Sequence, residues 1–128
     1  MSTLLDTHFL VWIVLNTKRL RQFPWLALYR PWGVSPVSLL EIQFLSEVGK
    51  LAVNNPGFTQ TVMRDPRFVV DDIGIMALNS HAQVLSWTRD PFDRLLVAHS
   101  SARRVPLCTT DRLIRGNHRL LVQEIGQL

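Results

Sequence analysis

The sequence predicts an α/β fold in which a central parallel sheet is flanked by helices. Short apolar segments with strand character alternate along the chain with amphipathic helical segments, a pattern typical of parallel sheets. In addition, four carboxylates stand where an apolar segment ends or a helix begins: Asp6, Glu41, Asp93 and Asp111. Such positions converge on one edge of an open α/β sheet, so these distant residues are expected to share one small volume.

The expected elements follow this alternation from the first residues onward. Strands are expected at residues 3–6, 33–35, 68–70, 105–109 and 120–125. Helices are expected at residues 7–15, 36–47, 56–63, 73–85 and from residue 91 onward, with a helical turn at 111–114. The basic and aromatic segment 18–32 contains two prolines, which limit helix length, so we expect a loop with one helical turn there.

Two of these helices have clear start signals. Ser35 precedes Pro36, which places a capping hydroxyl before a proline at the first helical position, and Gly49 provides the stop. Asp90 precedes Pro91 in the same way. This placement leaves Glu41 in the second turn of its helix.

Length and composition are those of one compact domain, residues 1–128, with 47% hydrophobic residues and a net charge of +4. The only cysteine, Cys108, excludes an intrachain disulfide, and its apolar neighbours predict a buried, inert thiol. The apolar run 9–15 is too short to span a bilayer and follows no positively charged segment, so a soluble cytoplasmic protein is expected. The basic surface suits a polyanionic substrate, although it would equally serve solubility alone.

Gathered carboxylates need a counter-charge. Two of them at about 4 Å repel by roughly 1–4 kcal/mol, depending on the local dielectric. Protons or a hard divalent cation such as Mg²⁺ relieve that repulsion. One or two such ions can activate water and stabilise the charge that develops during phosphodiester cleavage.

Four sequence motifs carry a resemblance to a known family. They are Leu-Leu-Asp-Thr-His at 4–8, Ser-Pro-Val-Ser-Leu-Leu-Glu-Ile at 35–42, Arg-Asp-Pro-Phe-Asp-Arg-Leu-Leu-Val-Ala at 89–98 and Leu-Cys-Thr-Thr-Asp at 107–111. Together, and in this order, they resemble the PIN-domain ribonucleases, specifically the VapC-type toxins of bacterial toxin–antitoxin pairs.

The resemblance implies a PIN-like three-layer sandwich with a Mg²⁺ or Mn²⁺ site at the carboxyl edge of the sheet. It also implies endonucleolytic cleavage of RNA, a homodimer, and inhibition by a small antitoxin protein. By position, Asp6, Glu41, Asp93 and Asp111 would be the catalytic and metal-binding residues, here called the acidic quartet. The residues expected to support them are Thr7, Thr109 and Asp90.

The chain departs from the pattern of the resemblance at three places, which bear on substrate choice. Trp87-Thr88 stands where a histidine is common, His99-Ser100 replaces Gln-Ala, and Leu45-Ser46 occupies a region where lysine is common. None of these departures removes a member of the acidic quartet.

Each acid also has a purely local interpretation. Asp6, Asp90 and Asp111 are placed to cap helices, and Glu41 follows Ser38 at capping-box spacing. Asp93 would gain modestly from the helix macrodipole in the first turn of its helix. The hydroxyls of the two threonines could bond local backbone instead of a ligand. Three arginines are phosphate-binding candidates, although a solvated surface would explain them equally well: Arg94, Arg112 and Arg115.

Two functions compete with the nuclease. One is a catalytically silent PIN-like binding module, against which the complete acidic quartet argues. The other is a phosphoacceptor signalling domain, with Asp71-Asp72 imitating the acceptor. That domain needs an acidic pair after the first strand and a lysine near the last, whereas Asp6 stands alone and the lysines are Lys18 and Lys50.

Overall fold

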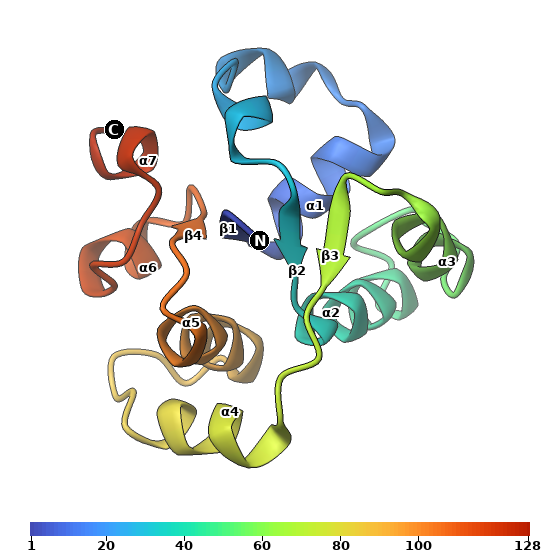
Figure 1. The fold of residues 1–128 in the computed structure, drawn as a ribbon. Helices are drawn as coiled ribbons and strands as arrows, with labels where there is room; N and C mark the ends of the chain where they lie inside the picture. Colours follow the sequence, from blue (N-terminus) through green and yellow to red (C-terminus); the bar gives the residue numbers. More distant parts are fainter.

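In the computed structural model, which describes residues 1–128, four short parallel strands form one sheet in the order β3-β2-β1-β4 (Figure 1). The strands are β1 (Thr3–Leu5), β2 (Trp32–Val34), β3 (Phe68–Val70) and β4 (Leu107–Cys108). Because β1 pairs in parallel with both β2 and β4, the residues that follow it lie at the same sheet edge as those that follow its neighbours.

Helical elements connect the strands and cover the sheet. In chain order they are α1 (Thr7–Leu15), the 3-10 helices η1 (Lys18–Gln22) and η2 (Leu26–Tyr29), α2 (Pro36–Glu47), α3 (Gly57–Arg64), α4 (Ile75–Gln83), α5 (Pro91–Arg103), α6 (Arg112–Asn117) and α7 (Gln123–Gly126). None of these helices is both long enough and apolar enough to cross a membrane.

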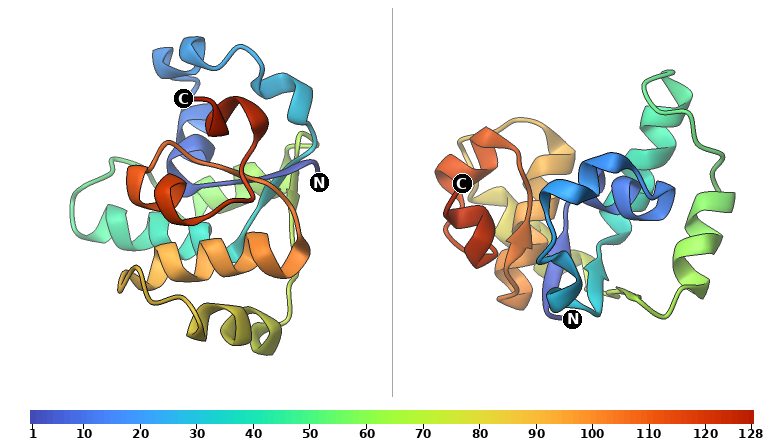
Figure 2. Two further views of the ribbon diagram at one scale, coloured as in Figure 1. Left: turned by 90° about the vertical axis from the view of Figure 1, so that its left-hand side faces the viewer. Right: turned by 90° about the horizontal axis from the view of Figure 1, so that it is seen from above.

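The two sheet faces carry different layers, as the alternation of side chains along β1 shows. Leu5 points into the main core, which contains Phe9 and Ile13 of α1 together with residues of α3 and α7. Leu4 points to the opposite face and packs against Leu96 of α5 and residues of α6. Helix α4 lies outside α5, with which it shares a further apolar cluster (Figures 1 and 2). The predicted parallel sheet between helical layers is therefore confirmed.

The expected last strand, residues 120–125, is wrong. Only a single bridge joins Leu121 to Leu107, after which the chain turns into α7. Val122 and Ile125 are buried three residues apart, a spacing that suits one face of a helical turn as well as an apolar strand. The sequence pattern alone does not separate these two interpretations in so short a run.

The segment 18–32 also differs from the expectation of a loop with one helical turn. It forms the two 3-10 helices η1 and η2 and enters β2 at Trp32. The indole N–H of Trp32 donates to the carbonyl of Leu26 at 2.9 Å, which ties η2 to the edge of the sheet. Cys108 is fully buried as predicted, and burial, with Asp6 and Glu124 adding to it, raises the pKa of its thiol.

Candidate active site

The residues that follow β1 and β4 meet the first turns of α1, α5 and α6 at the carboxyl edge of the sheet. Here a small cavity of about 30 Å³ is formed, which has room for a water molecule or a single ion. We call it the quartet cavity. Its lining consists of Asp6, Thr7, His8, Glu41, Asp93, Leu96, Asp111 and Ile114. The structure thus brings together all four members of the acidic quartet, which come from four separate segments of the sequence.

Helix capping fixes two acids of this cavity, Asp6 and Asp111, and a third acid, Asp90, that does not line it. The Oδ1 atom of Asp6 accepts the N–H of Phe9 at 2.8 Å, and that of Asp111 accepts the N–H of Ile114 at 2.9 Å. Asp90 caps α5 through its Oδ1 atom in the same way. The local interpretations of these acids are therefore correct. They do not exclude a ligand role, because each cap engages only one of the two carboxylate oxygens.

Glu41 is held by Thr7. The Thr7 hydroxyl donates to Glu41 Oε1 at 2.6 Å and lies 3.1 Å from the hydroxyl of Ser38. The capping-box interpretation of Ser38 and Glu41 is wrong, since Ser35 caps α2 by accepting the N–H of Val37 at 3.2 Å. Glu41 consequently lies in the second turn, where its carboxylate reaches the cavity.

Thr109 links two members of the acidic quartet. Its hydroxyl accepts the N–H of Asp111 at 3.1 Å, and its hydrogen bond to Asp6 favours the ionised form of that carboxyl. Thr7 and Thr109 therefore both bond acids of the cavity, in addition to any local backbone role.

The cavity holds more negative charge than its surroundings neutralise. Burial raises the pKa of Asp93 to about 7, with the charges of Asp90, Asp111, Glu41 and Asp6 adding to the effect. Burial likewise raises the pKa of Asp6, against the opposing hydrogen bonds from Phe9 and Thr109. It also raises the pKa of Glu41, against the hydrogen bond from Thr7. Such a cluster favours uptake of a proton or a cation.

The donor chemistry suits a hard divalent cation. Carboxylate oxygens are the ligands that Mg²⁺ and Mn²⁺ prefer, and the quartet cavity provides several of them in a small volume. As the side chains lie, no three histidine, cysteine, aspartate or glutamate groups converge at metal-binding distance. A divalent cation held here by one or two carboxylates would complete its coordination with water molecules. The carboxylate of Asp93 accepts no hydrogen bond that contributes to its pKa, so its oxygens are free for such a role.

A second, larger cavity adjoins the first. It measures about 290 Å³, shares Asp6, His8 and Asp111 with the quartet cavity, and is otherwise lined by Trp12, Arg19 and Thr110. We call it the side cavity. Sequence reasoning assigned no site role to His8, Trp12 or Arg19. The available signal was the adjacency of His8 to Asp6 and the absence of any acid between residues 7 and 40.

The three arginines expected to contact phosphates do not line either cavity. The guanidinium of Arg94 donates to the carbonyl of Thr88 at 3.1 and 2.9 Å, and that of Arg115 donates to the carbonyl of Leu128 at 2.8 Å. Arg112 is exposed in the first turn of α6, beside Asp111.

The departure at His99 forms a buried network with residues that directly follow β2 and β3. His99 is fully buried, and its ring nitrogens lie 2.7 Å from Ser35 Oγ and 2.7 Å from Asp71 Oδ2. Arg103 Nε donates to the same Asp71 oxygen at 2.8 Å. Burial alone would raise the pKa of Asp71, but the hydrogen bonds from Arg103 and His99 lower it overall.

The adjacent Ser100 forms a second network. Its hydroxyl donates to the carbonyl of Val105 at 2.6 Å and lies 2.9 Å from Nε2 of His118. These contacts join the last part of α5 to the segment that precedes β4 and to the residue that caps the end of α6. Both members of the departure at 99–100 therefore stabilise the packing of α5, and neither lines the quartet cavity.

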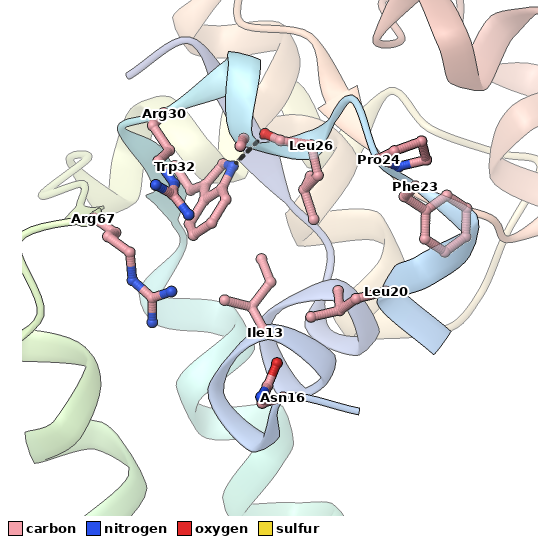
Figure 3. A pocket seen from close by; sticks show the side chains of 10 residues that line it. Ile13, Asn16, Leu20, Phe23, Pro24, Leu26, Arg30, Trp32 and Arg67 are labelled. Carbon is pink, nitrogen blue, oxygen red and sulfur yellow. Dashed lines mark hydrogen bonds between the residues drawn. The ribbon is translucent and has the colours of Figure 1, made fainter. Parts of the chain in front are cut away.

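A third cavity, of about 280 Å³, lies between α1, η2 and β2. Figure 3 shows apolar side chains of its lining, including Ile13 and Leu26, and Arg30 and Arg67 near Trp32. The two guanidinium carbons lie 4.8 and 5.6 Å from the Trp32 ring. No carboxylate or other reactive side chain lines this cavity, so it offers nothing for the chemistry of the acidic quartet.

Fold and cavity together define an α/β protein with an acid cluster at the carboxyl edge of a parallel sheet. No protein-family model and no curated protein sequence matches the chain. Among solved structures, a chain of a toxin–antitoxin complex from Klebsiella pneumoniae is similar, with 17% identity and a TM-score of 0.63 over 95% of this chain and 97% of that one.

A second similar chain belongs to VapBC2 from Rickettsia felis bound to a DNA fragment from its promoter. It is 17% identical, with a TM-score of 0.64 over 95% of this chain and 96% of that one. Both likenesses extend over nearly the whole chain, and they confirm the fold that the resemblance to VapC-type toxins implies.

Proposed function

We propose that this protein is a metal-dependent endoribonuclease that acts as the toxin of a type II toxin–antitoxin pair. One observation carries the catalytic part of the proposal. The folded chain gathers four carboxylates around a cavity of about 30 Å³, where burial and the charges of neighbouring acids raise the pKa of Asp93 to about 7. Helix capping accounts for the positions of Asp6 and Asp111, but it does not account for the addition of Glu41 and Asp93 to the same cavity.

The acidic quartet would hold Mg²⁺ or Mn²⁺ in this cavity. When bound, the ion supplies an activated water and neutralises charge on the phosphate. Thr7 orients Glu41, and Thr109 orients Asp6 and Asp111 through the hydrogen bonds described above. Asp90 fixes the first turn of α5 and adds negative charge beside Asp93, which strengthens cation binding.

The proposed partners are an antitoxin protein and a second copy of the chain, in the cytoplasm. The support for an antitoxin is that both similar structures are toxin–antitoxin complexes. The chain also exposes large apolar side chains on α4, with Ile75 66% and Met76 73% exposed, which is typical of surfaces that contact a protein. Size-exclusion chromatography with light scattering tests the homodimer, because a single species at 14.7 kDa would contradict it.

The nuclease is tested by incubating the purified protein with total RNA and sequencing the RNA ends. We expect discrete new ends with Mg²⁺ or Mn²⁺, none with EDTA, and recovery when the ion is restored. Asp6→Asn keeps the helix cap, because asparagine also caps, but removes a charge, so this variant should remain folded and lose cleavage. Undiminished cleavage by folded Asp6→Asn protein would refute the role of that residue.

Two competing functions give other results. A silent binding module would show no heat of Mn²⁺ binding at millimolar ion in a calorimetric titration. A phosphoacceptor domain is disfavoured because Asp71, its candidate acceptor, is bonded to His99 and Arg103. Covalent labelling by a small phosphodonor such as acetyl phosphate would reverse that conclusion.

A further inference from the structure

We propose that the side cavity binds the RNA phosphodiester adjacent to the cleaved one, with Arg19 as its phosphate ligand. The inference rests on the proposed nuclease function and adds a substrate subsite to it. It concerns single-stranded RNA, whose backbone can follow a surface cavity of this kind.

The position of the cavity carries the first step. Asp6, His8 and Asp111 line both the quartet cavity and the side cavity, so the two cavities are adjacent at the carboxyl edge of the sheet. A strand with one phosphate at the quartet cavity therefore has its neighbouring nucleotide at the side cavity. The side cavity, with a volume of about 290 Å³, has room for part of a neighbouring nucleotide. The quartet cavity, with about 30 Å³, does not have room for a nucleotide.

The second step is the state of Arg19. Its guanidinium carbon lies 4.6 Å from the centroid of the Trp12 ring, a cation–π contact that orients the side chain. Trp12 is itself fixed by Phe9 and by Phe23, at ring-centroid distances of 5.0 and 6.0 Å. No carboxylate forms an ion pair with Arg19, and the three ion pairs of the structure lie elsewhere. Arg19 is thus an oriented guanidinium whose donors remain free for a phosphate.

The third step is electrostatic. The acidic quartet repels RNA, so the phosphates on either side of the cleavage point need cations that the quartet does not supply. Residues 7–40 include Lys18, Arg19, Arg21 and Arg30 and no acid. Of these, only Arg19 lines the side cavity, where the Thr110 hydroxyl is available as a further hydrogen-bond donor.

The experiment compares Arg19→Gln with Arg21→Gln, its matched control. Arg21 lies on the same 3-10 helix, is exposed, and lines neither cavity, so its loss changes the net charge equally. Both substitutions are made in the Asp93→Asn background, so that binding is measured without cleavage. The probe is a fluorescein-labelled single-stranded RNA octamer, and fluorescence anisotropy gives Kd at several salt concentrations.

We expect Arg19→Gln to raise Kd about tenfold and to make the slope of log K against log salt shallower by about 0.7, the value for one lost phosphate contact on a single strand. Arg21→Gln should change Kd less than twofold. Trp12→Phe, which keeps a weaker aromatic face, should raise Kd about threefold. Equal Kd values for RNA in the two arginine variants would overturn the subsite. So would an Arg19→Gln variant that binds the antitoxin more weakly but binds RNA with an unchanged Kd. Circular dichroism melting checks that each variant is folded.

The same variants in the otherwise unchanged protein separate this proposal from the nuclease itself. If the unchanged protein cleaves RNA while the two arginine variants bind and cleave alike, the subsite is refuted and the nuclease stands. If the unchanged protein does not cleave RNA while Arg19→Gln still weakens binding relative to Arg21→Gln, the nuclease is refuted and the RNA subsite stands.

Discussion

Two polar clusters lie at different positions along α5, one at its first turn and one in its second half, and differ in how their charges are balanced. In the first, Asp71 contacts His99 and Arg103, and its side chain is only 17% exposed. The hydrogen bonds of these partners outweigh burial and lower its pKa. In the second, Asp93 has four acids as its charged neighbours, and burial together with their charges raises its pKa to about 7.

The difference separates a structural aspartate from a functional candidate. Both residues are aspartates near the end of a strand or the start of a helix, although only Asp93 lies within one of the four sequence motifs. A cluster that satisfies its own charges stabilises the fold, whereas one that leaves them unbalanced gains stability only when a ligand arrives. The comparison predicts that Asp71 and Asp93 respond in opposite ways to the same substitution.

The largest expected effect is on cleavage. Asp93→Asn should lower kcat/KM for RNA by about 1,000-fold, since it removes a charge directed at the reacting centre. Asp71→Asn should leave kcat/KM of the folded protein within about threefold. Both variants are assayed with Mg²⁺ at a temperature where circular dichroism shows each to be folded. Similar losses in the two variants would remove the distinction between the clusters.

The next effect is on stability. His99→Ala should lower the free energy of unfolding by about 2–4 kcal/mol, because it empties a buried site and removes one partner each from Ser35 and Asp71. Urea denaturation measures this change. His99→Gln retains polar atoms in the site and should lose less, so an equal loss for both variants would show that the hydrogen bonds contribute little.

A smaller effect of opposite sign is expected at the acid cluster. The pKa of Asp93 rises from 3.8 to about 7 on folding, so metal-free stability falls as the pH rises through that window. At pH 8 the penalty is fully present. Asp93→Asn should then raise the free energy of unfolding by about 1–2 kcal/mol, allowing for solvent screening of the partly exposed carboxyl. Thermal melting in EDTA at pH 8 tests this, and a decrease in Tm would contradict the electrostatic account.

The smallest effect concerns His118. Burial lowers the pKa of this histidine below its usual 6.5, so the unfolded chain binds more protons and stability falls as the pH drops below that value. We expect a small loss of stability between pH 7 and pH 5. The Asp93→Asn background is needed, because Asp93 acts in the opposite direction over the same range. Adding His118→Gln to this background should remove the loss of stability between pH 7 and pH 5, which would assign the loss to His118. The same loss in both proteins would contradict the assignment.

Most of the fold was predictable because its signals are local. Ser35 and Asp90 cap their helices as expected, with a proline following each, and β1 ends just before Asp6. The closeness of Asp6 and Asp111 was predictable because parallel pairing of β1 with β4 brings the chain segments after them together. The roles of Glu41 and Asp93, which lie within helices, came from the resemblance to PIN-domain motifs.

The remaining features depend on contacts between distant segments. The bond between His99 and Ser35 joins residues 64 positions apart, and no local pattern announces it. The contact of Arg19 with Trp12 depends on how η1 folds back over α1. The prediction of a strand at residues 120–125 was wrong for a related reason. Val122 and Ile125 are buried because they pack into the main core, and this contact between distant segments favours a helical turn over a strand.

The capping role of Asp6 and Asp111 has a consequence for how activity would be lost over generations. Alanine at either position would abolish both the charge and the hydrogen bond that starts a helix, damaging the scaffold along with the chemistry. Asparagine would preserve the helix cap and relieve the repulsion between the carboxylates. A single substitution would then abolish activity and raise the stability of the domain. Descendants of this chain that keep only a binding role are therefore expected to carry asparagine at these positions more often than alanine.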